Sequence, residues 1–470
     1  MLPKNLAYGS KVESASARSY RTNIQPQNGT GTYNASDTIL INIPTRNNLV
    51  FVPSESYLKF NVNVLAGGAD SAYARFDSCG AHGMIQRIRV FHGSNLLSDI
   101  DNYGLLAKLL FDLQVPTDSA YGKYSVLAGT RTDLTMTFPV LADANFTAAL
   151  FSKLSLPVQQ TNSGARLNAS ATIGAGTTVS QTYCINLITL AGSLCKDKYF
   201  PLFACTSAPL RIEIQLAPSC IAAMCIETAC TFTIDKCEYI SQMIELSDNA
   251  MNIIRESQNG QPLQFVNPDY RNYQYNFALA TAGTQLTMPI PAKFSSLKSI
   301  FVCARDSAVA PKLKYFPFSC NKFGISQYFF RIGAQVLPSK FPDSLPEMFA
   351  EAVKAIGSMS DLNHQPSIDN LSYTQDVAVI NANDSSVAFT PASYAAVSNV
   401  NSGSFYVGLD LENYANADKG AIFSGWNSNT DDIYFIPSFT PAAAVNARFD
   451  AFAMFDTVVV FENGTCYVKY

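Results

Sequence analysis

The stretch VPSESYLKFNV at residues 52–62, which follows INIP at residues 41–44, has a counterpart later in the chain. Residues 287–291 read TMPIP and residues 294–302 read FSSLKSIFV, so a short apolar segment ending in proline again precedes a β-like run. A pattern that recurs at a long interval indicates that one structural unit is present twice. We therefore predict two similar β units joined in tandem.

Two further landmarks recur in the same order, roughly 220–250 residues apart. Residues 87–91 (RIRVF) precede a predicted helix at about 99–113, and residues 328–332 (YFFRI) precede a predicted helix at about 345–357. The last landmark is a pair of strands, expected across residues 230–246 and again across residues 446–461.

The chain has 470 residues, whereas a single hydrophobic core rarely grows beyond about 250–300 residues. We predict a first unit over residues 23–245 and a second over residues 246–470, joined near residues 245–249. The segment 245–268 shows no strong strand pattern and suits a linker. Residues 1–22 are rich in Ser, Ala and Asn and are predicted to form a flexible arm.

Charge excludes some partners. The net charge of −4 and the pI near 5.5 argue against a globally basic nucleic-acid binder. Only the arm is basic, through Lys4, Lys11, Arg18 and Arg21. A solvated tail is the simpler interpretation of this charge, and contact with nucleic acid or with a neighbouring subunit is the alternative.

The surface is expected to be weakly charged. Charged residues make up 14% of the chain, against about 25% in an ordinary soluble domain. Hydrophobic residues reach 48%, yet no run approaches the ~18–20 apolar residues of a membrane span. We expect much of this surface to be buried against other subunits; a β-rich protein with a neutral polar surface is the alternative.

Alternating apolar and polar residues predict strands throughout the chain. Residues 57–64 and 210–216 are clear cases, and residues 450–461 run into an Asn463-Gly464 hairpin turn. Long polar stretches at 158–182 and 380–404 suggest outward-facing loops, with plain disordered insertions as the alternative.

Two helices are expected between strands. Ser98 or Asp99 is the expected cap of the first, and the second begins near Ser344 and Pro346. The first carries an apolar stripe made by Leu105, Leu106, Leu109, Leu110 and Leu113. A leucine stripe at this spacing indicates packing against the core rather than a membrane or a partner helix.

The sequence contains few motifs that are associated with catalysis. None of the three histidines, His82, His92 and His364, belongs to a metal-binding or protease motif. No G-x-S-x-G elbow or phosphate-binding loop occurs. The glycines Gly174 and Gly176 are followed by Thr-Thr-Val instead of a helix, so they do not form a dinucleotide fingerprint.

Acidic residues offer only weak candidates. Glu245, Glu256 and the Asp431-Asp432 pair are conceivable as acid and base of a glycosidase. Asp99 with Asp101, or the Asp431-Asp432 pair, is conceivable as a calcium site. Solvated carboxylates explain all of these more simply. We predict no enzymatic activity and no catalytic, cofactor-binding or metal-binding residues.

Eleven cysteines are present, and Cys220, Cys225, Cys230 and Cys237 form a cluster. Their spacing does not match the C-x2-C knuckles of zinc sites, so reduced core thiols are expected. With no secretory signal at the N-terminus, this implies synthesis and assembly inside a cell. The single tryptophan, Trp426, is expected to anchor the sandwich or an interface rather than bind a sugar.

Several stretches resemble one family. Residues 291–305 resemble the Arg/Lys-x-x-Ser-Leu-Lys-x-Ile strand found early in the second half of double jelly-roll major capsid proteins of double-stranded DNA viruses. The segments that resemble the late part of these proteins are 405–412, Ser424-Gly425 and Asn429-Thr430. Residues 199–202 and 208–216 are similar to the closing part of their first jelly roll. The family includes the virophage, polinton-like virus and adenovirus hexon-like lineages.

The resemblance implies an all-β fold of two tandem eight-stranded jelly-roll sandwiches, with short helices in the inter-strand loops. It implies a non-enzymatic major capsid protein without cofactors, located in the virion. Three copies would form a pseudo-hexagonal capsomer, and capsomers would tile an icosahedral shell. The implied partners are the chain itself, neighbouring capsomers and minor capsid or penton proteins. Nucleic acid would be contacted at most through residues 1–22, and an internal membrane is left open.

Two other functions are compatible with the sequence. A minor capsid or vertex protein would differ from a major one only in copy number. A tandem β-sandwich that binds or cleaves carbohydrate would show rows of exposed aromatic side chains and would be secreted. The single tryptophan and the missing signal disfavour this second alternative.

Overall fold

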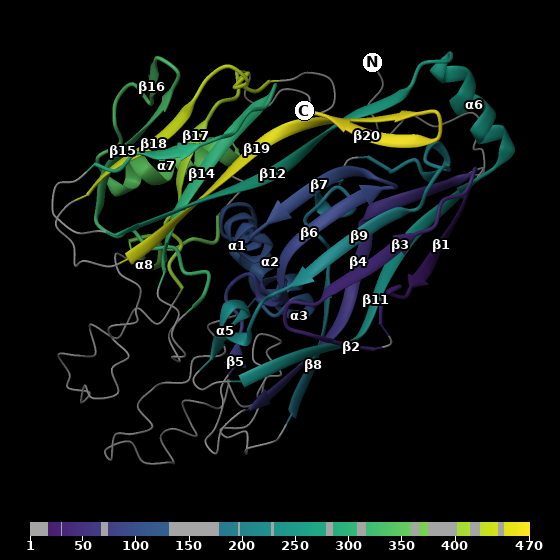
Figure 1. The fold of residues 1–470 in the computed structure, drawn as a ribbon, viewed down its shortest axis with the longest axis horizontal. Helices are drawn as coiled ribbons and strands as arrows, with labels where there is room; N and C mark the ends of the chain where they lie inside the picture. The colour runs from purple at the N-terminus through teal and green to yellow at the C-terminus, as the bar shows by residue number, and fades with distance from the viewer. Residues whose placement is uncertain are drawn as a thin grey trace, which may run out of the picture.

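The structure, a computed structural model, describes residues 17–29, 31–66, 74–130, 178–195, 198–226, 230–278, 285–307, 316–357, 359, 366–374, 402–413, 424–439 and 446–470. Two β-sandwiches lie side by side (Figure 1). We call the one built from strands before residue 247 the first roll, and the one built from strands after residue 262 the second roll.

The first roll contains two sheets. One has the strand order β1-β11-β4-β8, with β2 also paired to β11, and the other has the order β3-β9-β6-β7. The bounds are β1 (Ala17–Ile24), β2 (Thr32–Asn34), β3 (Thr38–Ile43), β4 (Leu49–Ala66), β6 (Ile85–His92), β7 (Asn95–Asp101), β8 (Thr178–Ile185), β9 (Leu210–Leu216) and β11 (Cys230–Leu246). A separate two-stranded ribbon joins β5 (Ala74–Arg75) to β10 (Cys225–Ile226).

The second roll repeats this arrangement. One sheet has the order β12-β19-β14-β17, with β20 also paired to β19, and the other has the order β13-β18-β15-β16. The bounds are β12 (Leu263–Ala278), β13 (Met288–Ile290), β14 (Leu297–Asp306), β15 (Ile325–Ile332), β16 (Gln335–Leu337), β17 (Val407–Asp410), β18 (Ile433–Phe439), β19 (Asn446–Glu462) and β20 (Thr465–Lys469).

The duplication is confirmed strand by strand. Reading each sheet in order, β1, β11, β4 and β8 correspond to β12, β19, β14 and β17, and β3, β9, β6 and β7 correspond to β13, β18, β15 and β16. Four strands in each of two facing sheets form an eight-stranded jelly roll. The predicted fold of two tandem jelly rolls is therefore confirmed.

Two equivalent hairpins, one in each roll, show how closely the rolls agree. Residues 91–97 read FHGSNLL and residues 331–337 read RIGAQVL, and each forms the turn between two paired strands. In the first, His92 pairs with Asn95; in the second, Ile332 pairs with Gln335. Gly93 and Gly333 take φ values of 59° and 56°, a left-handed conformation that glycine adopts without steric cost.

The strands bury one face each, as the alternation predicts. In β9, the apolar residues Leu210, Ile212, Ile214 and Leu216 are buried and the polar residues between them are half-buried. The predicted hairpin at Asn463-Gly464 is also present, with φ values of 52° and 76° between β19 and β20. These residues supply the positive φ that a two-residue turn requires.

The helices partly match the prediction. The observed helices are α1 (Tyr103–Gln114), α2 (Thr117–Tyr121), α3 (Lys123–Leu127), α5 (Cys220–Ala223), α6 (Asp248–Gln258), α7 (Leu345–Ile356) and α8 (Asn370–Thr374). Single turns of 3-10 helix lie at η2 (Gly80–Met84), η5 (Ser193–Cys195) and η6 (Leu202–Ala204). Helix α7 follows Ser344 at the predicted place, but that side chain makes no capping hydrogen bond.

The predicted start of α1 is wrong. Residues 99–101 belong to β7, where Asp99 pairs with Arg89 of β6, and the helix begins only after Asn102. Ser98 and Asp99 cannot cap it, because the first donates to Asp269 and the second binds Arg87. The hairpin with β6 therefore overrides the local capping signal.

Two expectations about strands and linkers are also wrong. Residues 230–246 form a single strand with a bulge instead of a strand pair, and residues 446–462 form a single regular strand, because each pairs along its length with neighbouring strands. The expected linker at 245–268 contains α6 and the start of β12. The Ser247 side chain accepts a hydrogen bond from the Ala250 backbone N–H and caps α6.

The N-terminal arm differs from the expectation in its last residues. Residues 17–22 belong to β1, whose backbone pairs with β11 along the edge of the sheet. An edge strand with one solvent-facing side needs few apolar residues, which is why its composition looked like that of a tail. Residues 1–16 and most of the polar stretches at 158–182 and 380–404 lie outside the described residues.

Among the described residues, no helix combines the length and the apolar character that crossing a bilayer requires. The domain boundary between residues 245 and 246 stays a prediction.

Candidate functional site

The two rolls share a buried junction. Strands β12 and β20 of the second roll lie against β6 and β7 of the first, and α1 lies between the rolls (Figure 1). Side chains of the second roll complete the hydrophobic core of the first, namely Tyr270, Phe301, Cys303, Phe318, Cys320, Tyr406, Phe452, Val459, Phe461 and Cys466. A continuous core of this kind holds the rolls as one unit rather than as two loosely linked domains.

Backbone hydrogen bonds join strand β20 to the first roll. The Cys466 N–H donates to Nδ1 of His92 at 3.1 Å, and the Cys466 carbonyl accepts from the Asn95 side chain at 3.0 Å. Nearby, the rings of Phe200 and Phe461 pack edge-to-face with centroids 5.2 Å apart. These contacts join residues that are more than 250 positions apart in the sequence.

A buried ionic cluster lies at the centre of the junction. Lys108 of α1 is 1% exposed, and its ammonium lies 2.9 Å from the Asp112 carboxylate and 3.7 Å from that of Asp77. We call these three residues, with their partners Ser402, Ser404 and Tyr406 from the second roll, the Lys108 cluster.

The second roll satisfies the polar atoms of this cluster. The Tyr406 and Ser404 hydroxyls each donate to Asp112 at 2.8 Å, and the Ser402 hydroxyl donates to Asp77 at 2.9 Å. Burial by itself lowers the pKa of Lys108, but the carboxylates of Asp112 and Asp77 raise it above its ordinary value, so the ammonium stays charged. A buried charge is tolerated only when it is paired and hydrogen-bonded in this way.

A second polar group lies further along the junction. The Asp450 carboxylate is fully buried, and it binds Arg305 at 2.8 Å within the second roll. Its other oxygen accepts from the Asn102 side chain of the first roll at 2.9 Å. Asn102 therefore connects the start of α1 to the second roll, which explains why it occupies the cap position without capping the helix.

The Asp269 carboxyl on β12 is also buried in the junction. It accepts a hydrogen bond from the Ser98 hydroxyl of β7 at 3.0 Å. Burial raises the pKa of Asp269 from its ordinary value of 3.8 to about 7, although the hydrogen bonds from Tyr270 and Ser98 oppose the shift. This contact is therefore sensitive to pH near neutrality.

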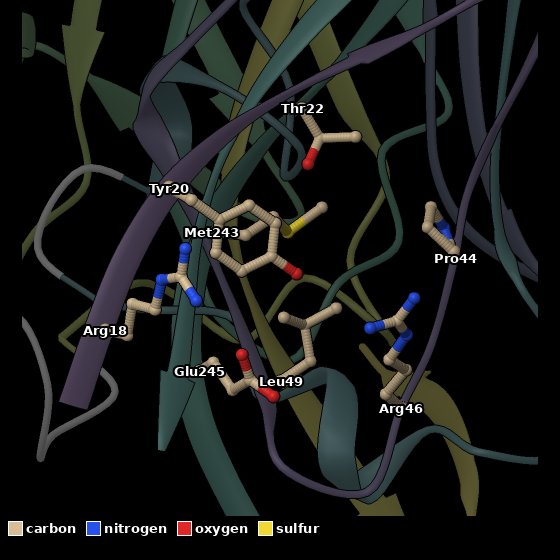
Figure 2. Close-up of a pocket in the computed structure, with 8 residues that line it drawn as sticks. All are labelled: Arg18, Tyr20, Thr22, Pro44, Arg46, Leu49, Met243 and Glu245. Carbon is tan, nitrogen blue, oxygen red and sulfur yellow. The ribbon is translucent and has the colours of Figure 1, made fainter.

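Each roll also has a surface that is open. On the first roll, an open pocket lies over β1 and β11 (Figure 2). It is lined by Arg18, Tyr20, Thr22, Pro44, Arg46, Leu49, Met243 and Glu245. Tyr20 faces Met243 across the strand pair and packs, half-buried, against the core of the first roll.

On the second roll, the open surface is the β16 edge. Val336 on β16 is 39% exposed and Phe341 just after it is 36% exposed, and the ring of Phe341 stacks on Phe329 at 4.6 Å. Their counterpart in the first roll, strand β7, is covered by β12 and β20. Strands β1 and β16 are thus the topological equivalents of β12 and β7, which meet inside the molecule.

The described histidines have structural roles. Nδ1 of His82 lies 3.0 Å from the Tyr103 hydroxyl, and burial lowers the pKa of His82 to about 3, so the ring is neutral. His92 accepts the Cys466 N–H described above. His364, like Gly174 and Gly176, lies outside the described residues.

The candidate carboxylates do not converge. Asp99 pairs with Arg87 at 2.7 Å, and Asp432 pairs with Lys293 at 2.9 Å. The Asp101 side chain accepts from the Asn102 N–H, Glu256 is exposed on α6, and Glu245 lines the open pocket. In the described part of the chain, no three His, Cys, Asp or Glu side chains form a group able to hold a metal ion.

Trp426 anchors a loop to the second roll. Its backbone pairs with Leu297, and its indole N–H donates to Asp431 at 3.2 Å. The ring also packs against the core of the second roll. This half-buried position agrees with a structural anchor.

The sequence did not identify Lys108, Asp77 or Asp112. One signal was present, because a lysine and an aspartate four residues apart interrupt an otherwise apolar helix. That spacing normally describes an exposed ion pair. Only the approach of residues 402–406 from the second roll turns it into a buried cluster.

Comparison with known proteins identifies the fold through structure alone. No protein-family model and no curated protein sequence matches the chain. A chain from the Sputnik virophage structure matches with a TM-score of 0.58 and 10% identity, covering 100% of this chain and 91% of that one. The mavirus major capsid protein matches with a TM-score of 0.56 and 11% identity, covering 100% and 93%. A chain of the PBCV-1 virus capsid matches with a TM-score of 0.57 and 8% identity, covering 98% and 99%.

Proposed function

We propose that this double jelly-roll chain is a viral major capsid protein that builds an icosahedral shell and has no enzymatic activity. One observation carries the proposal: two topologically equal rolls meet through β7 and β12, and the equivalent edge strands β16 and β1 are partly exposed. The likeness to the mavirus major capsid protein and to a PBCV-1 capsid chain supports it.

The geometry of the junction favours a ring. Inside one copy, β7 of the first roll receives β12 of the second. Repeating that contact between copies would place β16 of one second roll against β1 of the next first roll. Such a contact is heterologous, and heterologous contacts close into a ring when the rotation per step divides a full turn. Three copies would supply six similar rolls, which gives a homotrimer of pseudo-hexagonal outline.

The edge of β1 is the expected seat for the neighbouring copy. In the junction, the equivalent strand β12 is covered by the first roll. We expect the exposed residues of β1 to become similarly buried when the β16 edge of another copy covers them. A permanent interface of this type buries apolar area, and Val336 and Phe341 supply such area.

The structural role is supported by the state of the polar side chains. The fold alone does not decide function, since one fold hosts many activities. Within the described residues, the histidines and most of the candidate carboxylates are occupied by structural hydrogen bonds and ion pairs. This arrangement fits a building block better than a carbohydrate-active protein.

Further partners follow from the capsid role as part of the same proposal. Trimers would contact neighbouring capsomers and minor capsid or penton proteins in the virion, after assembly inside the host cell. Any contact with nucleic acid would come at most from the part of the arm that precedes β1. A major capsid protein, unlike a minor or vertex protein, would account for most of the protein mass of a purified particle.

The proposal is tested first by the size and shape of the purified protein. Light scattering coupled to gel filtration should give the mass of three chains, and electron microscopy should show particles of hexagonal outline. A stable monomer at high protein concentration would contradict the proposal.

The location of the interface is tested separately by substitution. Val336→Asp places a charge on the β16 edge, so we expect monomers whose circular dichroism matches that of the original protein. Ile253→Asp is the matched control, since Ile253 is 59% exposed on α6 and belongs to neither β1 nor β16. If Val336→Asp stays trimeric while Ile253→Asp becomes monomeric, the interface lies elsewhere on the protein. The proposal that the protein is a trimer would still stand.

A further inference from the structure

Two cysteine side chains approach each other at one end of the first roll. Cys220 is the first residue of α5 and Cys230 is the first residue of β11, and their sulfur atoms lie 3.0 Å apart. A disulfide bond has an S–S length of about 2.05 Å. A movement of about 1 Å would therefore bring the sulfurs to bonding distance, and α5 already packs against β11.

The two sulfurs have different surroundings. Cys220 is 3% exposed, whereas Cys230 is half-buried and reaches the surface. The hydrogen bond from Cys220 lowers the pKa of the Cys230 thiol, although burial opposes this effect. The thiolate is the reactive form of cysteine. Cys230 thus combines access to solvent with a neighbour that stabilises its ionised form.

Two other thiol pairs provide an internal comparison. Cys205 interacts with Cys466 across the junction, and Cys303 interacts with Cys320 in the second roll. All four side chains are no more than 2% exposed. Interaction with Cys466 raises the pKa of Cys205, and burial raises the pKa of Cys303, so neither ionises readily. These pairs resemble Cys220 and Cys230 in proximity but not in accessibility.

We propose that Cys220 and Cys230 are a redox modification site, at which a small disulfide oxidant such as oxidised glutathione closes an intramolecular disulfide. The two buried pairs stay reduced under the same conditions. The new bond ties α5 to the start of β11 and closes the loop between them. This chemistry does not depend on the capsid role.

The reaction proceeds in two balanced exchanges. The Cys230 thiolate attacks one sulfur of oxidised glutathione, which forms a mixed disulfide and releases one glutathione thiolate. The sulfur of Cys220 then attacks the sulfur of Cys230, and the Cys220 proton passes to the departing sulfur of the second glutathione. This glutathione leaves as a thiol, and the first glutathione thiolate takes up a proton from solvent. One molecule of oxidant is reduced to two thiols as the protein dithiol is oxidised.

The test uses the full-length protein in its native assembly state. The protein is reduced, desalted and treated with increasing ratios of oxidised to reduced glutathione. After denaturation, free thiols are alkylated and the peptides are mapped by mass spectrometry. We expect one disulfide per chain, in a peptide pair that contains Cys220 and Cys230, while Cys205, Cys466, Cys303 and Cys320 are alkylated. The melting temperature of the oxidised protein should rise by several degrees, because the cross-link restricts the unfolded chain.

Two variants test the order of the exchanges. In Cys220→Ser, the reaction should stop at a glutathione adduct on Cys230. Cys205→Ser is the matched control and should leave the Cys220–Cys230 disulfide unchanged. The inference is overturned if a ratio of oxidised to reduced glutathione that oxidises a free dithiol in solution leaves Cys220 and Cys230 reduced. It is also overturned if a Cys205–Cys466 disulfide forms first. Peptide mapping of the original protein decides these outcomes even if a variant does not fold.

Discussion

The same structural element is buried in one roll and open in the other. In the first roll, every residue of α1 from Tyr103 to Leu113 is buried, including Lys108. In the second roll, the equivalent α7 buries only Met348, Ala352 and Ala355. The strands before these helices differ in the same way, since β7 is covered by the second roll and β16 is not.

The difference shows that position, not sequence pattern, determines burial here. The hairpins that precede the two helices share their turn geometry and register. Lys108 in α1 has its ammonium in a buried cluster, whereas Lys354 in α7 is 49% exposed and forms a short-range pair with Glu351. The two rolls thus present equivalent faces, and such a face becomes part of the core only where a neighbouring roll covers it.

The largest effect should come from breaking the Lys108 cluster. Lys108→Ala leaves the carboxylates of Asp77 and Asp112 buried without their cation, and removing one partner of a buried ion pair costs about 3–5 kcal/mol. We expect the free energy of unfolding, measured by denaturant titration, to fall by about this amount.

The matched substitution on the open face is Lys354→Ala. Because that ion pair is exposed, the free energy of unfolding should change by less than about 0.5 kcal/mol. Equal effects of the two substitutions would show that the two helices are in similar environments, contrary to the comparison.

The next largest effect should be a pH-dependent gain in stability from Asp269→Asn. The pKa of Asp269 is raised in the folded state, so the folded carboxyl resists ionisation. Below pH 3.8, its ordinary pKa, the Asp269 carboxyl does not lower the stability of the folded protein. The loss of folding stability grows as the pH rises to about 7. Asparagine keeps the acceptor for Ser98 and Tyr270 and carries no charge.

Asp269→Asn should therefore stabilise the protein at pH 8 by up to about 4 kcal/mol, since one pKa unit corresponds to about 1.4 kcal/mol. At pH 4 the two proteins should be nearly equal. Denaturant titrations between pH 4 and pH 8 measure the difference. A stability loss that is the same at both pH values would indicate that Asp269 is ionised and well solvated in the folded protein.

The smallest effect should come from the two equivalent hairpins. Asn95→Ala removes the hydrogen bond to the Cys466 carbonyl, and an unpaired buried acceptor costs about 1–3 kcal/mol. Gln335→Ala, at the equivalent exposed position, should change the unfolding free energy of an isolated chain by less than about 0.5 kcal/mol. A loss of trimers in Gln335→Ala without a loss of chain stability would sharpen the comparison by placing this hairpin in the interface.

Much of the fold could be predicted because it is encoded locally. The alternation in residues 210–216 and the recurrence of landmarks such as INIP and TMPIP specify strands and their order. Helix α6 was missed because its sequence is mostly polar, and only Met251 is buried. The start of α1 was misplaced because Ser98 and Asp99 are good caps but are paired in β7.

The junction could not be predicted because its partners are distant in the sequence. Lys108 meets Ser404, which is 296 positions away, and Asp77 meets Ser402, which is 325 positions away. No local pattern reports such a contact. The equivalence of β1 and β12 appears only when the strand pairs are compared in space.

The long sequence separation of the contacts around β7 and α1 has a consequence for the order of folding. Closing a contact between distant residues is entropically costly, and proteins dominated by such contacts fold slowly. During translation, the first roll leaves the ribosome before the second, so the Lys108 cluster is at first without its partners Ser402, Ser404 and Tyr406. We therefore expect a nascent intermediate that binds chaperones until the second roll arrives, and a refolding yield that falls as protein concentration rises.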